Sequence, residues 1–248
     1  MIRLQEIRKT FHKGEAAEVR ALNNINLEIK KSEFVILLGA NGSGKSTLLN
    51  VLSGATLPDQ GKIFIADTDV TMLPEFRRSK WISRVFQNPL AGTVSELTIL
   101  ENFRLAAIRA HPKKLILGST GKFRSQVRDK IAGLNLGLEN KVEALMGTLS
   151  GGQRQALTLL MAVMDDAALL LLDEPAAALD PKTSVTIMKL AEKIIMDHQL
   201  TAILVTHNLK DAAMYGSRIL LMSEGNITKD VARSESINPD AGTLFEWF

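Results

Sequence analysis

The sequence predicts an α/β fold with a parallel sheet at its core. Residues 34–38 form a short, continuous apolar run, which is typical of a strand buried on both faces. Two similar runs, at 169–172 and 202–205, are separated by one amphipathic helix at 181–196. Because strand, helix and strand form the repeating unit of a parallel sheet, we expect all three strands to lie in one sheet.

The N-terminal residues follow a different pattern, which predicts an antiparallel β subdomain. Residues 2–7 and 25–30 alternate apolar and polar side chains with period two, as strands with one buried face do. A charged loop at 13–20 joins them. A turn at 58–61 leads to another short strand at 63–65.

A helical subdomain is predicted as an insertion into this core. The pattern is helical from residue 96 to 147, with a loop around 112–121. A further helix at 149–164 opens with Ser150, a good N-cap. We expect one domain over 1–235, composed of a core (1–87 and 155–235) and a helical subdomain (88–154), followed by a C-terminal tail (236–248).

Composition limits the classes of protein to which the chain can belong. With 46% hydrophobic and 23% charged residues, the 248-residue chain is typical of soluble globular proteins. Its apolar runs are far shorter than the ~20 residues that a transmembrane helix needs, and the polar start predicts no signal peptide. The lack of cysteine excludes disulfides. The net charge is only +3 and basic residues are interspersed with acids, so we expect no nucleic-acid partner. The basic segment 111–130 is either a solvated loop leading into a helix or a contact with lipid headgroups or a partner subunit.

The turn after the strand at 34–38 has the composition of a phosphate-binding loop. It consists of Gly39, Ala40, Asn41, Gly42, Ser43, Gly44, Lys45, Ser46 and Thr47, which matches GxxxxGK[ST]. Its glycines allow backbone N–H groups to point at phosphate oxygens, and the following helix N-terminus adds partial positive charge. Lys45 supplies a full charge to the β- and γ-phosphates, and the Ser46 hydroxyl is placed to ligate Mg²⁺.

Three more polar side chains follow the other parallel strands, so they should meet this loop at the carboxyl edge of the sheet. Asp173 and Glu174 come directly after the strand at 169–172, where buried carboxylates need a compensating cation. We interpret Asp173 as a ligand of Mg²⁺ and Glu174 as the general base that polarises the attacking water, although such a pair can also cap a helix. His207 ends the strand at 202–205 and is placed to hydrogen-bond the γ-phosphate; its alternative role is to cap the next helix.

Gln87 and Phe11 are two further candidates. Gln87 ends a strand at 82–86, and its amide oxygen would reach Mg²⁺ or the water; a turn position is the alternative. The Phe11 ring precedes the charged loop and would stack on adenine for about 1–3 kcal/mol, with core packing as the alternative.

Taken in order, these motifs resemble those of the ATP-binding cassette (ABC) ATPases over nearly the whole chain. Residues 149–153, Leu-Ser-Gly-Gly-Gln, are similar to the family's signature motif. Gln87 corresponds to the Q-loop glutamine, residues 169–174 to the second acidic motif, Asp180 to the end of the D-loop and His207 to the switch histidine. The resemblance implies a P-loop NTPase with a RecA-like core that binds ATP and Mg²⁺ and hydrolyses ATP.

The resemblance also implies partners. Two copies would pair head to tail, so that Ser150, Gly151, Gly152 and Gln153 would bind the ATP held by the other subunit. The helical subdomain would grip a separate membrane permease, which would make the chain a peripheral protein at the cytoplasmic face of the membrane. Ala177 stands where the D-loop usually carries serine, and Phe11 where tyrosine is more frequent.

Two kinds of transport remain open at this point. Residues 85–90 and 151–156 resemble bacterial uptake ATPases, which favours import of a small solute such as an amino acid with the help of an extracytoplasmic solute-binding protein. A lipoprotein-release or macrolide-export ATPase is the alternative, since those have a similar long loop after the N-terminal strand. A soluble ABC ATPase acting on ribosomes or DNA usually carries two cassettes or a long coiled coil, and this chain has neither.

Overall fold

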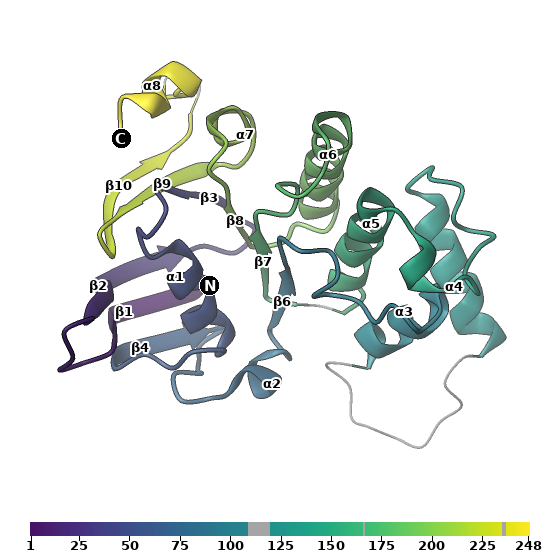
Figure 1. Ribbon diagram of the computed structural model, residues 1–248, viewed down its shortest axis with the longest axis horizontal. Coiled ribbons are helices and arrows are strands. Elements are labelled where there is room, and N and C mark those ends of the chain that lie inside the picture. Colours follow the sequence, from purple (N-terminus) through teal and green to yellow (C-terminus); the bar gives the residue numbers. More distant parts are fainter. Residues whose placement is uncertain (109–119, 166, 235–236) are drawn as a thin grey trace.

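The computed structural model describes residues 1–108, 120–165, 167–234 and 237–248. Figure 1 shows a small sheet beside a larger one, with α3, α4 and α5 forming a lobe on the far side of the larger sheet. The strands are β1 (Ile2–Phe11), β2 (Val19–Ile29), β3 (Phe34–Gly39), β4 (Gln60–Ile65), β5 (Thr68–Asp69), β6 (Ile82–Val85), β7 (Leu169–Asp173), β8 (Ala202–Val205), β9 (Arg218–Ser223) and β10 (Asn226–Ala232). The helices are α1 (Lys45–Ser53), α2 (Glu75–Arg78), α3 (Ile99–Ala107), α4 (Gly121–Ala132), α5 (Gly151–Ala162), α6 (Pro181–Asp197), α7 (Leu209–Met214) and α8 (Ala241–Phe245), with a 3₁₀ turn at Met146–Thr148.

The small sheet is antiparallel and has the strand order β2–β1–β4–β5. Ile2 pairs with Ile29 of β2 on one side and with Ile65 of β4 on the other. The predicted antiparallel subdomain is therefore confirmed. Its first two strands are longer than the predicted strands at 2–7 and 25–30. β1 extends to Phe11, and β2 begins at Val19.

The larger sheet has the strand order β10–β9–β3–β8–β7–β6. β3 is parallel to both of its neighbours, β8 and β9, while β7 is parallel to β8 and β6. The predicted parallel core is confirmed, and its three expected strands are contiguous in it. The sequence patterns did not predict β9, or β10, which pairs antiparallel with it at the edge.

The two faces of the larger sheet bury separate hydrophobic clusters. Val35 and Leu37 of β3 face the cluster shared with the small sheet and α1. Ile36 and Leu38 of the same strand face the cluster that α5, α6, α7 and α8 cover. Because both faces are covered, the strand is apolar throughout, which is why it has no period-two pattern.

A third cluster holds the helical lobe together and involves α3, α4 and α5. The prediction of helix from residue 96 to 147 is wrong over 133–145, which contains no helix. Asn135 (φ 54°) and Gly137 (φ 66°) adopt left-handed backbone conformations there, which a right-handed helix cannot continue. The predicted subdomain boundary at residue 154 falls within α5, whose side chains pack into both the lobe and the core. No helix in the described ranges is long and apolar enough to cross a membrane.

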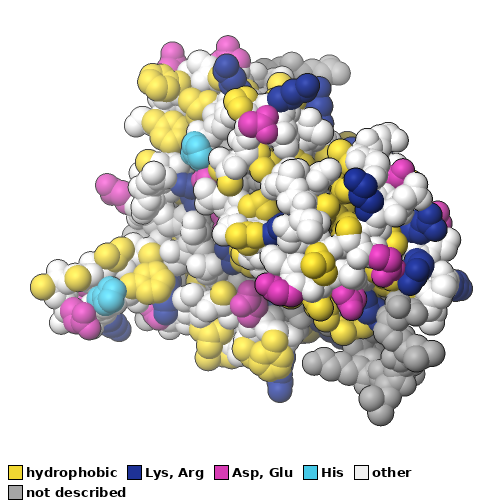
Figure 2. Space-filling model, turned by 45° about the vertical axis from the view of Figure 1, so that its right-hand side comes forward, with side chains coloured by type: hydrophobic (Ala, Val, Ile, Leu, Met, Phe, Trp, Pro, Cys, Tyr) yellow, Lys and Arg dark blue, Asp and Glu magenta, His cyan; other side chains and the backbone are white. Residues whose placement is uncertain are grey.

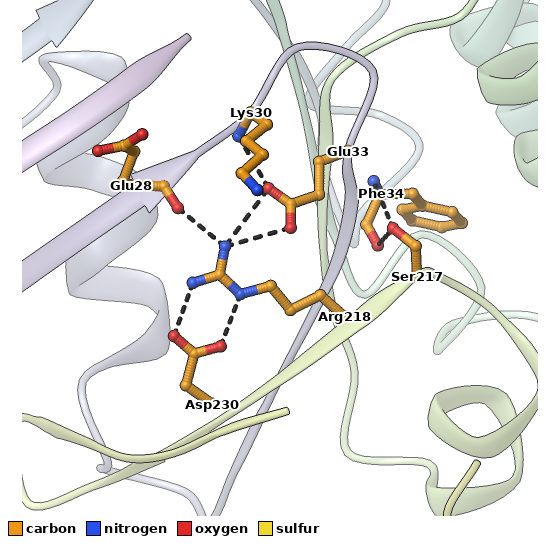
Figure 3. Close-up of polar contacts among 7 residues, drawn as sticks. All are labelled: Glu28, Lys30, Glu33, Phe34, Ser217, Arg218 and Asp230. Atoms are coloured by element: carbon orange, nitrogen blue, oxygen red, sulfur yellow. Dashed lines mark hydrogen bonds and ion pairs between the residues drawn. The ribbon is translucent and has the colours of Figure 1, made fainter. Parts of the chain in front are cut away.

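An arginine-centred network ties the two sheets together (Figure 3). Arg218 at the start of β9 donates two hydrogen bonds of 2.6 Å to the carboxylate of Asp230 on β10. Its Nη1 donates to the backbone carbonyl of Glu28 on β2 at 2.8 Å and contacts the Glu33 carboxylate at 3.2 Å. The two carboxylates raise the pKa of the guanidinium above its ordinary value. Arg218 thereby connects β2 of the small sheet to β9, the neighbour of β3 in the larger sheet.

Candidate functional site

A cavity of about 790 Å³ opens at the carboxyl end of β3. Its lining includes every residue of the predicted phosphate-binding loop except Ser43, together with Gln87, Glu174, His207 and Phe11. β3, β6, β7 and β8 lie side by side in the larger sheet, so their ends converge on this edge. The topology thus brings together side chains from four distant stretches of the sequence.

The glycines of the loop leave room for an anion. Gly44 has φ 105°, and a Cβ there would collide with the carbonyl oxygen of Ala21. Gly42 has φ 80°, and a Cβ there would meet nothing within 4 Å. Both positions are left-handed, which glycine adopts without strain. The loop is therefore an open cradle that leads into α1, whose N-terminus favours negative charge.

Lys45 spans the mouth of this cradle. Its Nζ donates to the backbone carbonyls of Gly39 and Ala40, both at 2.8 Å. Burial lowers the pKa of the ammonium group, while the carboxylates of Glu174 and Asp173 raise it. Since phosphate oxygens are stronger acceptors than backbone carbonyls, the cation is positioned to bind the phosphates of a nucleotide.

The side chains of Glu174 and His207 are in direct contact at the wall of the cavity. The Nδ1 of His207 lies 3.0 Å from Oε2 of Glu174, and the Glu174 side chain is 17% exposed, whereas that of His207 is 62% exposed. The N-cap of α7 is Asn208, whose side chain accepts hydrogen bonds from two backbone N–H groups. The alternative role of His207, as the cap of this helix, is therefore excluded.

Asp173 is held differently. The Nη2 of Arg84 lies 2.7 Å from its Oδ2, and Nη1 of the same guanidinium donates to the side chain of Asn50 on α1 at 2.7 Å. Unlike Glu174, Asp173 does not line the cavity. Sequence reasoning assigned the compensating charge to Mg²⁺ alone, but Arg84 already supplies a cation to this carboxylate. A signal was available, because Arg84 is the one charged residue of strand β6, whose sequence is Ile-Ser-Arg-Val.

The residues that face the cavity fit a magnesium–nucleotide complex. Mg²⁺ usually keeps several waters and is held by one or two protein oxygens together with substrate phosphates. Ser46 and Gln87 line the cavity beside the phosphate cradle. In the ranges that the structure describes, no three His, Asp or Glu residues gather to hold a metal by themselves. This donor set suits a metal that arrives with the nucleotide.

Phe11 lines the other end of the cavity, where its residue is 37% exposed and Lys9 Nζ lies 5.5 Å from the ring centroid. The alternative role, packing in the core, is therefore excluded. Val19, Ala21 and Phe248 also line the cavity and were not predicted. Phe248 is the last residue of the tail, and the tail contains α8, which packs against α7.

The predicted signature residues lie elsewhere. Ser150 caps α5, and its Oγ accepts from the backbone N–H of Gln153 while the Gln153 side chain accepts from the Ser150 N–H. A Cβ on Gly152 would collide with Thr183 on α6, so glycine allows the two helices to pack closely. None of residues 150–153 lines the cavity of the same chain.

Asp180 is the N-cap of α6. Its Oδ1 accepts from the backbone N–H of Thr183 at 3.1 Å, and the hydrogen bonds from Thr183 hold the pKa of Asp180 below its usual range. Of the basic segment 111–130, residues 111–119 lie outside the described part of the chain, and most of the remainder forms α4.

Comparison with known proteins agrees with this geometry. A model of the family described as ABC transporter matches residues 22–177, which is more than half of the chain. The chain is 36% identical to a tyrosine transport ATP-binding protein of Clostridioides difficile, covering 100% of this chain and 98% of that one. It is 34% identical to the macrolide export ATP-binding/permease protein MacB of Campylobacter fetus, covering 96% of this chain but 36% of that protein.

A solved structure has the same fold. The dimeric ATP-binding cassette MJ0796 of Methanocaldococcus jannaschii, in a post-hydrolysis state bound to ADP and Pi, superposes with a TM-score of 0.79. It is 30% identical, and the match covers 94% of this chain and 100% of that one.

Proposed function

The chain belongs to the ABC transporter family and is an ATP-binding, ATP-hydrolysing protein, and from this premise we propose that two copies close around ATP to drive solute import through a separate membrane permease. The observation that carries the proposal is the separation of the two halves of the site. The cradle, Glu174 and His207 line one cavity, while residues 150–153 cap a helix outside it. A second copy, paired head to tail, would bring its Ser150 to this cavity.

Within such a closed site the side chains have distinct roles. Lys45 exchanges its two backbone carbonyls for phosphate oxygens, and the loop N–H groups hold the β-phosphate. Mg²⁺ supplies positive charge to the phosphate oxygens when it is bound, and Ser46, Gln87 and Asp173 would hold it, directly or through water. Glu174 accepts the proton of the attacking water. His207, 3.0 Å from Glu174, holds that carboxylate, and it would hydrogen-bond the γ-phosphate, since it lines the same cavity as the loop.

The permease would dock on the helical lobe. A groove of about 350 Å³ between the end of β6 and α3 is lined by Phe86, Val94 and Leu105. Val94 and Leu105 are 40% and 47% exposed, so the groove presents apolar side chains to a partner. Figure 2 shows hydrophobic side chains interspersed with Lys, Arg, Asp and Glu over the face that includes this lobe. The chain would then be a peripheral protein at the cytoplasmic face of a membrane.

We favour import of an amino acid, with an extracytoplasmic solute-binding protein as a third partner. The support is the tyrosine transport protein, which matches over almost the full length of both chains. The macrolide export protein matches at similar identity over part of its length, so export is the alternative function. Transport in vesicles with the co-purified permease distinguishes the two by the direction of solute movement.

A mixing experiment tests the two-copy site. Ser150→Arg removes the donated half, and Lys45→Ala removes the receiving half; each variant alone should lose ATP turnover. In an equal mixture half of the dimers are mixed, and each has one complete site, so about a quarter of the wild-type turnover should return. If the mixture stays inactive while each variant remains folded and dimerises with the wild-type chain, the two-copy site is wrong.

A further inference from the structure

A buried amide on α5 connects the two strand ends that carry Gln87 and Glu174. Gln155 is fully buried, with 0% of its surface exposed. Its Nε2 donates to the backbone carbonyl of Phe86 at 3.1 Å and to that of Pro175 at 2.7 Å. Phe86 directly precedes Gln87, and Pro175 directly follows Glu174. One side chain therefore contacts the neighbours of two cavity-lining residues that come from different strands.

The Glu174 backbone needs such support. Its φ of 46° lies in the left-handed region, which a residue with a Cβ adopts at a cost of order 1–3 kcal/mol unless its surroundings hold it there. The Glu174 N–H donates to Val205 at 3.1 Å, and its carbonyl accepts from Ala177 at 3.1 Å. The bond from Gln155 to Pro175 adds a polar contact to this segment from the side of α5.

We propose that Gln155 is a positioning residue, which fixes the distance between Gln87 and Glu174 and keeps Glu174 in its left-handed conformation. The Gln155 side chain suits this role because one amide nitrogen carries two N–H donors in a fixed plane. Both of its acceptors are backbone carbonyls of residues that lie outside the helices and strands. Its own Oε1 is buried and has no hydrogen-bond partner among the described residues. The residue thus leaves an acceptor unsatisfied while both donors are used.

The position of Gln155 on α5 gives the contact a second consequence, which rests on the proposed function. Ser150 caps the same helix one turn earlier, and in the two-copy site it would bind the ATP of the other subunit. A shift of α5 on binding that ATP would move Gln155, and with it the spacing of Gln87 and Glu174 in its own chain. The helix therefore links the two nucleotide sites of a dimer.

The test compares Gln155→Met, which keeps the length of the side chain but has no donor, with Thr158→Val as a matched control. Thr158 is a buried polar residue of the same helix, 4% exposed, whose Oγ1 donates to the Arg154 carbonyl within that helix. Both variants lose a buried hydrogen bond of α5, but only the first loses the contacts to Phe86 and Pro175. Gln155→Glu serves as a second variant of nearly the same shape.

Gln155→Met should lower kcat for ATP hydrolysis by about 10–100-fold, since small misplacements of reacting groups have effects of this size. The Kd for ATP should stay within about threefold, because Lys45 and the loop are not touched. In the Glu174→Gln background the substitution should cause no further loss. Hydrogen exchange at the amides of Glu174 and Ala177 should accelerate in Gln155→Met and not in Thr158→Val.

Three results would overturn the proposal: equal loss of kcat and ATP affinity, the same loss in Thr158→Val, or unchanged exchange at Glu174 and Ala177 in both Gln155 variants. The exchange measurement needs no turnover. If the wild-type chain failed to hydrolyse ATP, the proposed function would fall, and the exchange data would still decide whether Gln155 holds the Glu174 segment.

Discussion

The guanidinium of Arg84 lies 2.7 Å from the carboxylate of Asp173, and both side chains are nearly buried, at 12% and 17% exposure. The pair joins the edge strand β6 to β7, and the bond from Arg84 to Asn50 extends it to α1. A partly desolvated carboxylate at this edge is thus neutralised by the protein itself. Arg84 therefore fixes the orientation of the Asp173 carboxylate independently of any metal.

Breaking this pair should destabilise the fold. We expect Arg84→Met to lower the free energy of unfolding by about 2–4 kcal/mol, because it leaves a buried charge without its partner. A double-mutant cycle with Asp173→Asn, followed by urea unfolding, should give a coupling energy of about 1–3 kcal/mol. The exposed pair Arg124–Glu143, at 48% and 57% exposure, is the control and should couple by about 0.5 kcal/mol or less. A coupling no larger than in this control would contradict the assignment.

Glu174→Gln should separate binding from hydrolysis. The amide cannot accept a proton from water, so turnover should fall by about 10²–10⁴-fold while the affinity for ATP is retained. The variant should also accumulate as an ATP-dependent dimer in light scattering. Glu75→Gln, at an exposed carboxylate on α2, is the control and should behave as wild type. Unchanged turnover in Glu174→Gln would exclude its role as the base.

Phe11→Ala should weaken binding of the base but not of the phosphates. Loss of one stacking contact is worth about 1–3 kcal/mol, so the Kd for ATP should rise by about 5–150-fold. The Kd for inorganic tripolyphosphate should not change. Titration calorimetry with both ligands measures the difference, with Phe76→Ala as the control, since Phe76 is 73% exposed and does not line the cavity. Equal losses for the two ligands would argue against stacking on adenine.

Arg78→Met should test how α1 is anchored below the phosphate cradle. Arg78 is 0% exposed, and its Nη1 donates to the backbone carbonyls of Val51 and Leu52 at the C-terminal end of α1. Leaving these carbonyls unpaired should cost about 3 kcal/mol or more in urea unfolding. The adjacent exposed Arg77→Met should change stability by about 0.5 kcal/mol or less.

The pKa of Arg78 determines the pH dependence of this loss. Burial lowers the pKa of Arg78 to about 10, below its ordinary value. The folded state therefore binds fewer protons than the unfolded state only near and above pH 10. The difference between wild type and Arg78→Met should therefore be constant from about pH 6 to about pH 9. A loss that varied over this range would show that another group titrates with the substitution.

The phosphate cradle could be predicted because all of its chemistry lies in nine consecutive residues, Gly39–Thr47, where glycine positions and a lysine determine the local backbone and charge. The same holds for residues 149–153, whose capping interactions span one helical turn. Asp173, Glu174 and His207 could be placed at the same edge of the sheet because the ends of parallel strands must meet there, and of the three Glu174 and His207 line the cavity.

Arg84 and Gln155 became functional candidates only in the tertiary structure. Arg84 is 89 residues from Asp173, and Gln155 is 69 residues from Phe86. Which strand lies next to which, and which helix covers the strand ends, depends on packing between distant segments, and no local period encodes it. The sequence by itself determined the loop that we expect to bind the phosphates; the packing of β6, β7 and α5 decided what holds the carboxylates in place.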